Sequence, residues 1–246
     1  MPYAFVWSQK RILFFMERYS VIREKRKREI VLLRGKGCAY KKCAFCDYHT
    51  DMCADEHANF LLNKSVLDRV TGEFGELEVI NSGSAFELDS ATLDYIKAVC
   101  AAKGIGIIHF ELHYMYRDRC DELRRMFGGF TVKIRLGLET FDYDLRERVW
   151  HKGIKDRDPA VISRGFDEAN FLFGVKGQTA QSMRRDAETG LKYFERIILN
   201  IMCENTTSVV PDKAAIDAFM REVYPAYKDD ERVDILINNT DFGVGD

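Results

Sequence analysis

Short apolar runs alternate along this chain with longer segments in which apolar residues recur at helical spacing. Such runs are typical of strands buried on both faces, and their alternation with helices is typical of parallel strands joined by helical crossovers. The pattern predicts strands at 30–34, 77–81, 106–112, 132–138, 170–175 and 196–202.

The segments between these strands carry apolar stripes of the kind that core-facing helices show. Further along, Asp158 and Pro159 predict an N-cap followed by proline in the first turn of a helix that runs to Phe166, and Pro211 predicts the start of another helix. Residues 233–237 could add a closing strand. The stripes are Val66, Leu67, Val70 and Phe74; Leu93, Ile96, Val99 and Cys100; and Cys120, Leu123 and Met126.

Six strand-helix units with a short tail predict an α/β fold, a partial (β/α)6 barrel of the TIM type. A complete eight-stranded barrel takes about 250 residues, and this chain of 246 is expected to begin with a helix. We expect one domain over 1–246, with a helical extension at 1–29, the partial barrel at 30–204, and a C-terminal helix and tail at 205–246 that close the barrel.

The charge balance excludes some partners. Lys and Arg total 37 against 39 Asp and Glu, and the net charge of -2 gives no general field for nucleic acid or an anionic membrane. The charged run at 23–29 is expected to be a solvated helix face. Charges from Lys10 onward interrupt the apolar cluster around Trp7 too early for a secretory or membrane-spanning segment. We therefore expect a cytoplasmic protein with a small substrate and no membrane partner.

Three cysteines follow the first predicted strand closely: Cys38, Cys43 and Cys46. Thiolates at such short intervals can hold one metal centre from a single loop, and the carboxyl ends of strands are where α/β barrels place their chemistry. Three thiolates on a cubic iron-sulfur cluster leave one iron free to bind another molecule.

A tetrahedral zinc site is the alternative interpretation, with His49 as fourth ligand or with Cys53 or His57 in its place. Structural zinc usually draws on two separated ligand clusters, and the sequence has no second Cys-x-x-Cys pair. The remaining cysteines are scattered and the total of seven is odd, which argues against disulfides and for a reducing compartment.

The cysteine loop, with Phe45 directly before its last cysteine, resembles the first loop of the radical S-adenosylmethionine (SAM) enzymes. The usual spacing in that family has three residues between the first two cysteines, whereas this chain has four. The resemblance implies a 4Fe-4S cluster on Cys38, Cys43 and Cys46, with SAM on the open iron. It also implies a 5'-deoxyadenosyl radical that removes a hydrogen atom from the substrate.

The resemblance further suggests which residues bind SAM. Asn81 and the turn Ser82-Gly83-Ser84 follow the second predicted strand, where the family has a glycine-rich turn that holds the amino group of the SAM methionine. Phe45 is expected beside the cofactor as well. An ordinary strand-to-helix turn is the alternative for the serine-glycine segment.

Alternation along the fourth predicted strand puts Arg135, Gly137 and Glu139 on one side. The run Gly-Leu-Glu-Thr there, with Lys152-Gly153 downstream, resembles radical SAM enzymes that modify RNA or nucleobase-like substrates. Arg135 is expected to bind the SAM carboxylate, and Glu139 to bind ribose hydroxyls or an amino group. A buried Arg-Glu pair that serves only the structure is the alternative.

Glu111 and His113 end the third predicted strand and face the same way. Glu111 is expected to accept from the ribose, and His113 to contact the substrate or donate a proton, since histidine titrates near neutral pH. A structural histidine with satisfied hydrogen bonds is the alternative for His113.

Substrate contacts are expected from the sixth strand and the tail. Alternation sends Asn200 and Glu204 into the barrel, and Asp241 and Phe242 add a carboxylate and a stacking ring. A carboxylate suits a guanine-like ring, because it can accept from the ring N–H and the exocyclic amine together. Ordinary capping and loop chemistry is the alternative for these residues.

On so short a chain, the segment from Gly37 to His49 is most similar to the bacterial queuine lyases. The resemblance implies cleavage of the carbon-nitrogen bond of queuine to release 7-aminomethyl-7-deazaguanine for queuosine salvage, with His49 near the substrate and flavodoxin or ferredoxin as reductant. The alternatives are a radical SAM lyase for another deazaguanine or for modified tRNA, as in archaeosine synthesis, and a non-catalytic zinc-binding module.

Overall fold

The structure is a computed structural model that describes residues 17–237, apart from the side chain of His49. Its strands form one eight-stranded sheet in chain order. The first strand, β1, is antiparallel to β2, and β2 to β8 are parallel. The strands are β1 Tyr19–Ile22, β2 Arg28–Leu33, β3 Glu76–Asn81, β4 Ile107–Leu112, β5 Thr131–Glu139, β6 Glu168–Phe173, β7 Arg196–Ile201 and β8 Val233–Leu236.

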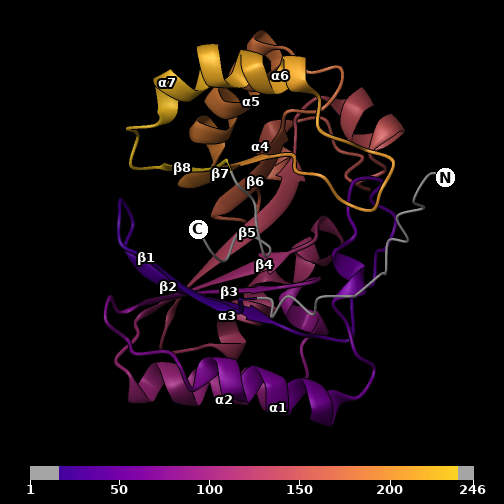
Figure 1. The fold of residues 1–246 in the computed structure, drawn as a ribbon. Helices are drawn as coiled ribbons and strands as arrows, with labels where there is room; N and C mark the ends of the chain where they lie inside the picture. The colour runs from indigo at the N-terminus through magenta and orange to yellow at the C-terminus, as the bar shows by residue number, and fades with distance from the viewer. Residues whose placement is uncertain (1–16, 238–246) are drawn as a thin grey trace, which may run out of the picture.

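Helices join the parallel strands and cover the outer face of the curled sheet, as Figure 1 shows. Most of them begin at a side chain that accepts a hydrogen bond from the first turn, such as Asp55 before α1 and Asp89 before α2. The helices are α1 Glu56–Leu67, α2 Ser90–Ala102, α3 Cys120–Met126, α4 Pro159–Ile162, α5 Ala180–Tyr193, α6 Lys213–Ala218 and α7 Tyr224–Tyr227. The sheet and its helical crossovers confirm the predicted partial TIM-type barrel.

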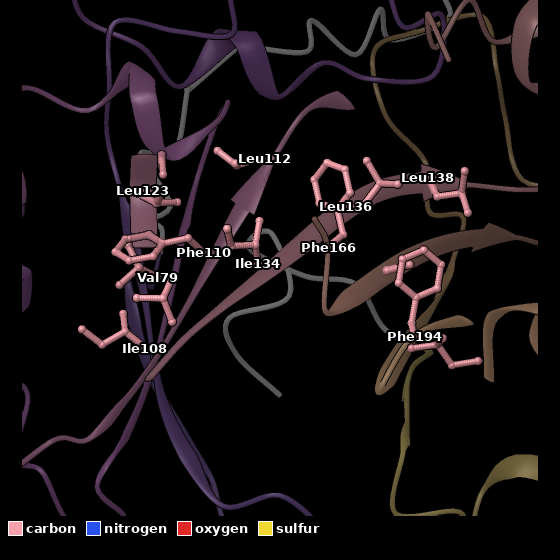
Figure 2. Close-up of a cluster of buried hydrophobic side chains, with 14 of the residues drawn as sticks. Val79, Ile108, Phe110, Leu112, Leu123, Ile134, Leu136, Leu138, Phe166 and Phe194 are labelled. Atoms are coloured by element: carbon pink, nitrogen blue, oxygen red, sulfur yellow. The ribbon is translucent and has the colours of Figure 1, made fainter. Parts of the chain in front are cut away.

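The main core lies between the sheet and these helices. Figure 2 shows part of it, with Ile108, Phe110 and Leu112 of β4 beside Ile134, Leu136 and Leu138 of β5. These residues alternate with His109, Glu111, Arg135 and Gly137, which face the inside of the barrel. The strict alternation fixes which side chains can line a site within the barrel.

Three sequence expectations about elements differ from the structure. Residues 17–29 contain strand β1 and the start of β2 in place of a helix. The run 23–29 is not a solvated helix face, because its last two residues, Arg28 and Glu29, are buried in strand β2. Arg28 pairs there with Glu78, and the Glu29 carboxylate accepts from the N–H groups of residues 71 and 72. The helix after Asp158 ends at Ile162 and does not reach Phe166, while the helix predicted from Pro211 is present as α6, which starts at Lys213 and is capped by Asp212.

The predicted closing strand is present as β8, which pairs with β7. Within residues 17–237, no helix has both the length and the apolar character needed to cross a bilayer.

Candidate functional site

The three clustered cysteines lie in the loop between β2 and α1, at the carboxyl end of the parallel strands. All three are free, partly buried thiols. Burial raises the pKa of Cys43 and raises that of Cys46 to about 12, while the nearby ammonium of Lys152 opposes both shifts. The thiols of Cys38 and Cys43 also raise the pKa of Cys46. The loop therefore brings the three thiols within electrostatic range of one another.

The connection after β5 holds this loop from one side. The Ala44 N–H donates to the Trp150 carbonyl at 2.9 Å, and the Tyr40 hydroxyl donates to the His151 carbonyl at 2.7 Å. Phe45 packs edge-on against the fully buried Trp150, with 5.6 Å between ring centroids. The position of the cysteines thus depends on a segment more than a hundred residues further along the chain.

The connection after β7 holds the same loop from another side. The Asn205 amide donates to the Phe45 carbonyl at 2.7 Å. The Thr206 N–H and hydroxyl both donate to the Asp47 carboxylate, at 2.9 and 3.0 Å. These contacts place the loop after β7 at the edge of the cysteine site.

The serine-glycine turn after β3 lies directly against the cysteine loop. The Ser82 hydroxyl donates to the Asp51 carbonyl, and the Ser84 hydroxyl accepts from the His113 N–H at 2.9 Å. A Cβ on Gly83 would overlap the Glu87 carboxylate and lie 3.1 Å from the Cys38 Cα. Only glycine allows this close approach, and the serine hydroxyls are already engaged with the protein.

Glu87 connects the two segments. Its carboxylate accepts from the Ala39 N–H at 2.7 Å, from the Ser84 N–H and from the Tyr116 hydroxyl at 3.1 Å. Ser84 and Glu87 form a capping box around the short helix Ala85–Glu87. The Asn81 amide donates to the Ser84 carbonyl at 3.1 Å and fixes the other end of the turn.

Glu139 lies at the end of β5 and is bound by Lys152. The Lys152 Nζ is 2.7 Å from the Glu139 Oε1, and both residues are buried. Glu139 has a left-handed backbone with φ of 72°, where the register of β5 against β6 shifts. A Cβ on Gly137 would lie 3.0 Å from the Lys152 Nζ, so this glycine leaves room for the ammonium inside the barrel.

Arg135 does not pair with Glu139, although alternation places both inside the barrel as predicted. The Arg135 guanidinium contacts the carboxylates of Glu78 at 2.5 Å, Glu168 at 3.1 Å and Glu111 at 3.2 Å. These contacts hold the guanidinium inside the barrel, away from the cysteines at the carboxyl ends of the strands. They give the predicted contact with the SAM carboxylate no support. They agree with the alternative of a buried Arg-Glu pair that serves only the structure, although the glutamates are Glu78, Glu111 and Glu168 and not Glu139.

Arg135 is part of a buried ionic layer that closes the amino-terminal end of the barrel. Glu78 binds Arg28, Arg135 and Arg196, and these positive charges hold its pKa well below the usual range despite burial. His109 lies between the carboxylates of Glu76 and Glu168, at 2.8 and 3.0 Å. Opposite charges in contact are what make so many buried ionic groups tolerable.

Glu111 stands at the upper edge of this layer and is partly exposed to the barrel interior. Its Oε1 accepts from Arg135 and, at 2.7 Å, from the amide of Asn170 on β6. The Asn170 Oδ1 is buried and has no hydrogen-bond partner. Glu111 and Asn170 therefore form a polar pair with acceptor capacity remaining inside the barrel.

His113 is a neutral, structurally satisfied residue. Its Nε2–H donates to the Lys152 carbonyl at 2.9 Å, and its Nδ1 accepts from the Met115 N–H at 3.1 Å. Its ring stacks on Tyr40 with 4.2 Å between centroids, and burial lowers its pKa to about 3. Both ring nitrogens are occupied, and the single proton of the neutral ring is held by the Lys152 carbonyl, which supports the structural alternative.

The predicted substrate residues are only partly brought together. Asn200 lies inside the barrel, and its amide donates to the Phe171 carbonyl at 3.3 Å. Glu204 is exposed in the loop after β7, since that strand ends at Ile201 before the alternation reaches it. Asp241 and Phe242 lie outside the described residues, as does the side chain of His49.

The donor set of the loop fits an iron-sulfur cluster. A single ion must contact all of its ligands, whereas a cluster binds each thiolate on a different iron. Among the side chains that the structure describes, no three His, Cys, Asp or Glu groups lie close enough to hold one ion, so the zinc alternative gains no support. A cluster would bind the cysteines as thiolates and displace their protons.

Several residues that build this site carry no clear signal in the sequence. Tyr40 lies in the cysteine loop and Lys152 lies after the fourth predicted strand, but their contacts join segments far apart in the chain, so no role could be predicted for them. The spacing Ser84-x-x-Glu87 is a capping-box signature and could have identified Glu87. Asn170 gave no signal beyond its place in a predicted strand.

Comparisons with solved structures find a queuine lyase from Clostridium spiroforme, bound to SAM and queuine, at 40% identity and a TM-score of 0.88. That match covers 94% of this chain and 100% of the other. Streptococcus suis SuiB matches at 11% identity and a TM-score of 0.54, over 83% of this chain and 48% of its own. SuiB bound to S-adenosylmethionine matches at 13% and 0.53, over 84% and 46%. The SuiB matches show the fold alone. No family model and no curated protein sequence matches the chain.

Proposed function

This chain belongs to the queuine lyase family of radical SAM enzymes, and on that premise we propose that it cleaves the carbon-nitrogen bond between the deazaguanine and the cyclopentenediol of queuine. The product is 7-aminomethyl-7-deazaguanine, available for queuosine salvage. The observation that carries the proposal is the 40% identity to a queuine lyase over the whole length of that protein.

Cys38, Cys43 and Cys46 would hold a 4Fe-4S cluster, with SAM on the iron that the cysteines leave open. When bound, these cofactors would use one electron from an external donor to supply a 5'-deoxyadenosyl radical, which can take a hydrogen atom from the cyclopentenediol ring. The chain's own part is to hold its ligands in register and keep water away from them.

SAM would lie between the serine-glycine turn and the end of β5. The serine hydroxyls are engaged with Asp51 and His113, and the Ser84 backbone is engaged with Asn81 and Glu87. We therefore assign the SAM amino group to the backbone of residues 82 and 83. Glu139 and the ring of Phe45 would complete the cofactor side. Asn81 supports the turn through its bond to Ser84 and acts as a positioning residue.

Queuine would lie deeper in the barrel and towards the loop after β7. A carboxylate can accept from the ring N–H and the amine of a deazaguanine together. Glu111 has an amide neighbour, Asn170, that faces the same space. Asn200 inside the barrel and Glu204 in the loop after β7 stay separate predictions for the substrate side. Asp241, Phe242 and His49 stay predictions for the substrate side.

The reaction needs an electron donor, for which flavodoxin or ferredoxin is our proposal. All seven cysteines are free thiols, and an iron-sulfur cluster is best kept in a reducing compartment, so we place the enzyme in the cytoplasm.

The test is product analysis by mass spectrometry. Protein purified without oxygen and reconstituted with iron and sulfide should convert queuine, SAM and reductant to 5'-deoxyadenosine and 7-aminomethyl-7-deazaguanine. Cys46→Ala should abolish both products, whereas the matched variant Cys100→Ala, in helix α2 on the outer face of the sheet, should retain them. Deoxyadenosine without the deazaguanine would move the search to another substrate, such as deazaguanine-modified tRNA. Intact SAM with wild-type protein would contradict the assignment.

A further inference from the structure

Lys152 places a buried positive charge beside the cysteine loop. Its side chain is 8% exposed, and its Nζ lies 5.4 Å from the centroid of the Phe45 ring, one residue before Cys46. The Glu139 carboxylate lies 2.7 Å from this Nζ, so the buried amine has a direct counter-ion that favours its charged form.

The backbone around Lys152 is fixed to the same loop. The Trp150 and His151 carbonyls accept from Ala44 and Tyr40, and the Lys152 carbonyl accepts from His113. The Lys152 N–H donates to the Arg146 carbonyl at 3.0 Å. Bonds on both sides of the residue hold its ammonium in register with the cysteines, which a flexible surface lysine could not achieve.

Glu139 orients the charge. Its Oε1 binds the Lys152 Nζ at 2.7 Å from the β5 side, whereas the ring of Phe45, which lies between Cys43 and Cys46 in the loop, is 5.4 Å from the same Nζ. The ion pair thus has its positive end towards the cysteine loop.

We propose that Lys152 is a positioning charge for the redox step: its ammonium stabilises the reduced form of the cluster and sets its potential. This inference rests on the proposed function. Three thiolates give the bound cluster a net negative charge, and reduction by one electron from the flavodoxin or ferredoxin donor adds another without a proton. A fixed positive charge in a low-dielectric site favours the more negative state.

The test is the midpoint potential of the reconstituted cluster without SAM or queuine, followed by electron paramagnetic resonance. Lys152→Met should make the cluster harder to reduce by at least tenfold in the oxidised-to-reduced ratio, which for one electron is about 59 mV towards negative values. Lys152→Arg keeps the charge and should stay near the wild type. Glu139→Gln leaves the ammonium unbalanced and should shift the potential in the opposite direction.

Lys25→Met is the matched control. Its Nζ binds the Asp230 and Val233 carbonyls before and within β8, at the end of the barrel away from the cysteines. Removing that charge should leave the potential unchanged.

The iron content of the reconstituted Lys152 variants is a second test of the proposal. Loss of iron in Lys152→Met with retention in Lys152→Arg supports the role of charge, whereas loss in both, or an unchanged potential in Lys152→Met, overturns it. A wild-type cluster with an unshifted Lys152→Met potential leaves the proposed function standing. A wild-type protein that takes up no cluster overturns both.

Discussion

Glu87 joins the cysteine loop to the turn after β3 by accepting from Ala39, Ser84 and Tyr116. Gly83 lies between this carboxylate and the backbone of Cys38. For the individual residues of the site, the close approach of the backbones of Gly83 and Cys38 is as important as the identity of the cluster ligands.

Gly83→Ala should weaken SAM binding by at least tenfold, because its Cβ would overlap the Glu87 carboxylate and push the turn away from Cys38. Overpacking of this kind costs about 1–3 kcal/mol of stability. Equilibrium dialysis of SAM with reconstituted protein measures the effect. Gly106→Ala is the control, since no atom lies within 4 Å of its Cβ position. Equal SAM affinity in Gly83→Ala and the wild type would refute the close-approach argument.

His113 should make the apoprotein sensitive to acid. Burial lowers its pKa to about 3, so between about pH 6.5 and that value the unfolded chain binds a proton that the folded chain does not. The free energy of unfolding therefore decreases as the pH is lowered through this window, and at pH 5 the loss relative to neutral pH is about 2 kcal/mol. In urea unfolding, His113→Gln should lose that much less than the wild type between pH 7 and pH 5. Parallel losses would mean that His113 is not buried as a neutral group.

At the scale of elements, the parallel strands share an ionic layer at their amino-terminal ends. Glu78 of β3 contacts Arg28 of β2, Arg135 of β5 and Arg196 of β7. One carboxylate thus joins strands that are distant in the sequence and closes the barrel beneath the site.

Glu78→Gln should destabilise the protein by about 3–5 kcal/mol, because it leaves buried guanidinium groups without their shared carboxylate. The urea midpoint of unfolding reports this. Glu73→Gln, which breaks only the exposed pair with Arg23, should have no measurable effect. A similar small loss in both variants would show that the buried layer is not held by charge.

The sequence predicted the parallel strands well at their apolar centres and poorly at their charged ends. Predicted strand 30–34 starts at Arg28, and predicted strand 170–175 starts at Glu168. Both early residues are charged and look solvated in the sequence. They are buried because partners from other strands meet them inside the barrel, and a linear pattern carries no record of such contacts.

The same limit applies to the site. Short motifs on single loops predicted the cysteines and the serine-glycine turn, because their chemistry is local. The prediction for Arg135 found the right face, but it did not foresee the contacts with Glu78, Glu111 and Glu168, since alternation gives direction but not depth in the barrel. The contacts of Lys152 and Asn170 depend on the assembled barrel and could not be predicted from spacing.

For the whole molecule, a half-barrel with the cysteine loop at the carboxyl ends of its strands matches a queuine lyase over nearly its full length. Loops after β3, β5 and β7 all meet the cysteine loop, so the site is assembled only when the barrel is complete. The central claim is that this assembled site directs a deoxyadenosyl radical to queuine.

Deuterium transfer tests that claim most directly. The reconstituted enzyme is incubated with SAM, reductant and queuine that is deuterated on the cyclopentenediol ring. The deuterium content of the 5'-deoxyadenosine is then measured by mass spectrometry. We predict deoxyadenosine that carries deuterium, formed together with 7-aminomethyl-7-deazaguanine. Unlabelled deoxyadenosine alongside the deazaguanine product, or deuterated queuine recovered intact, would contradict the account.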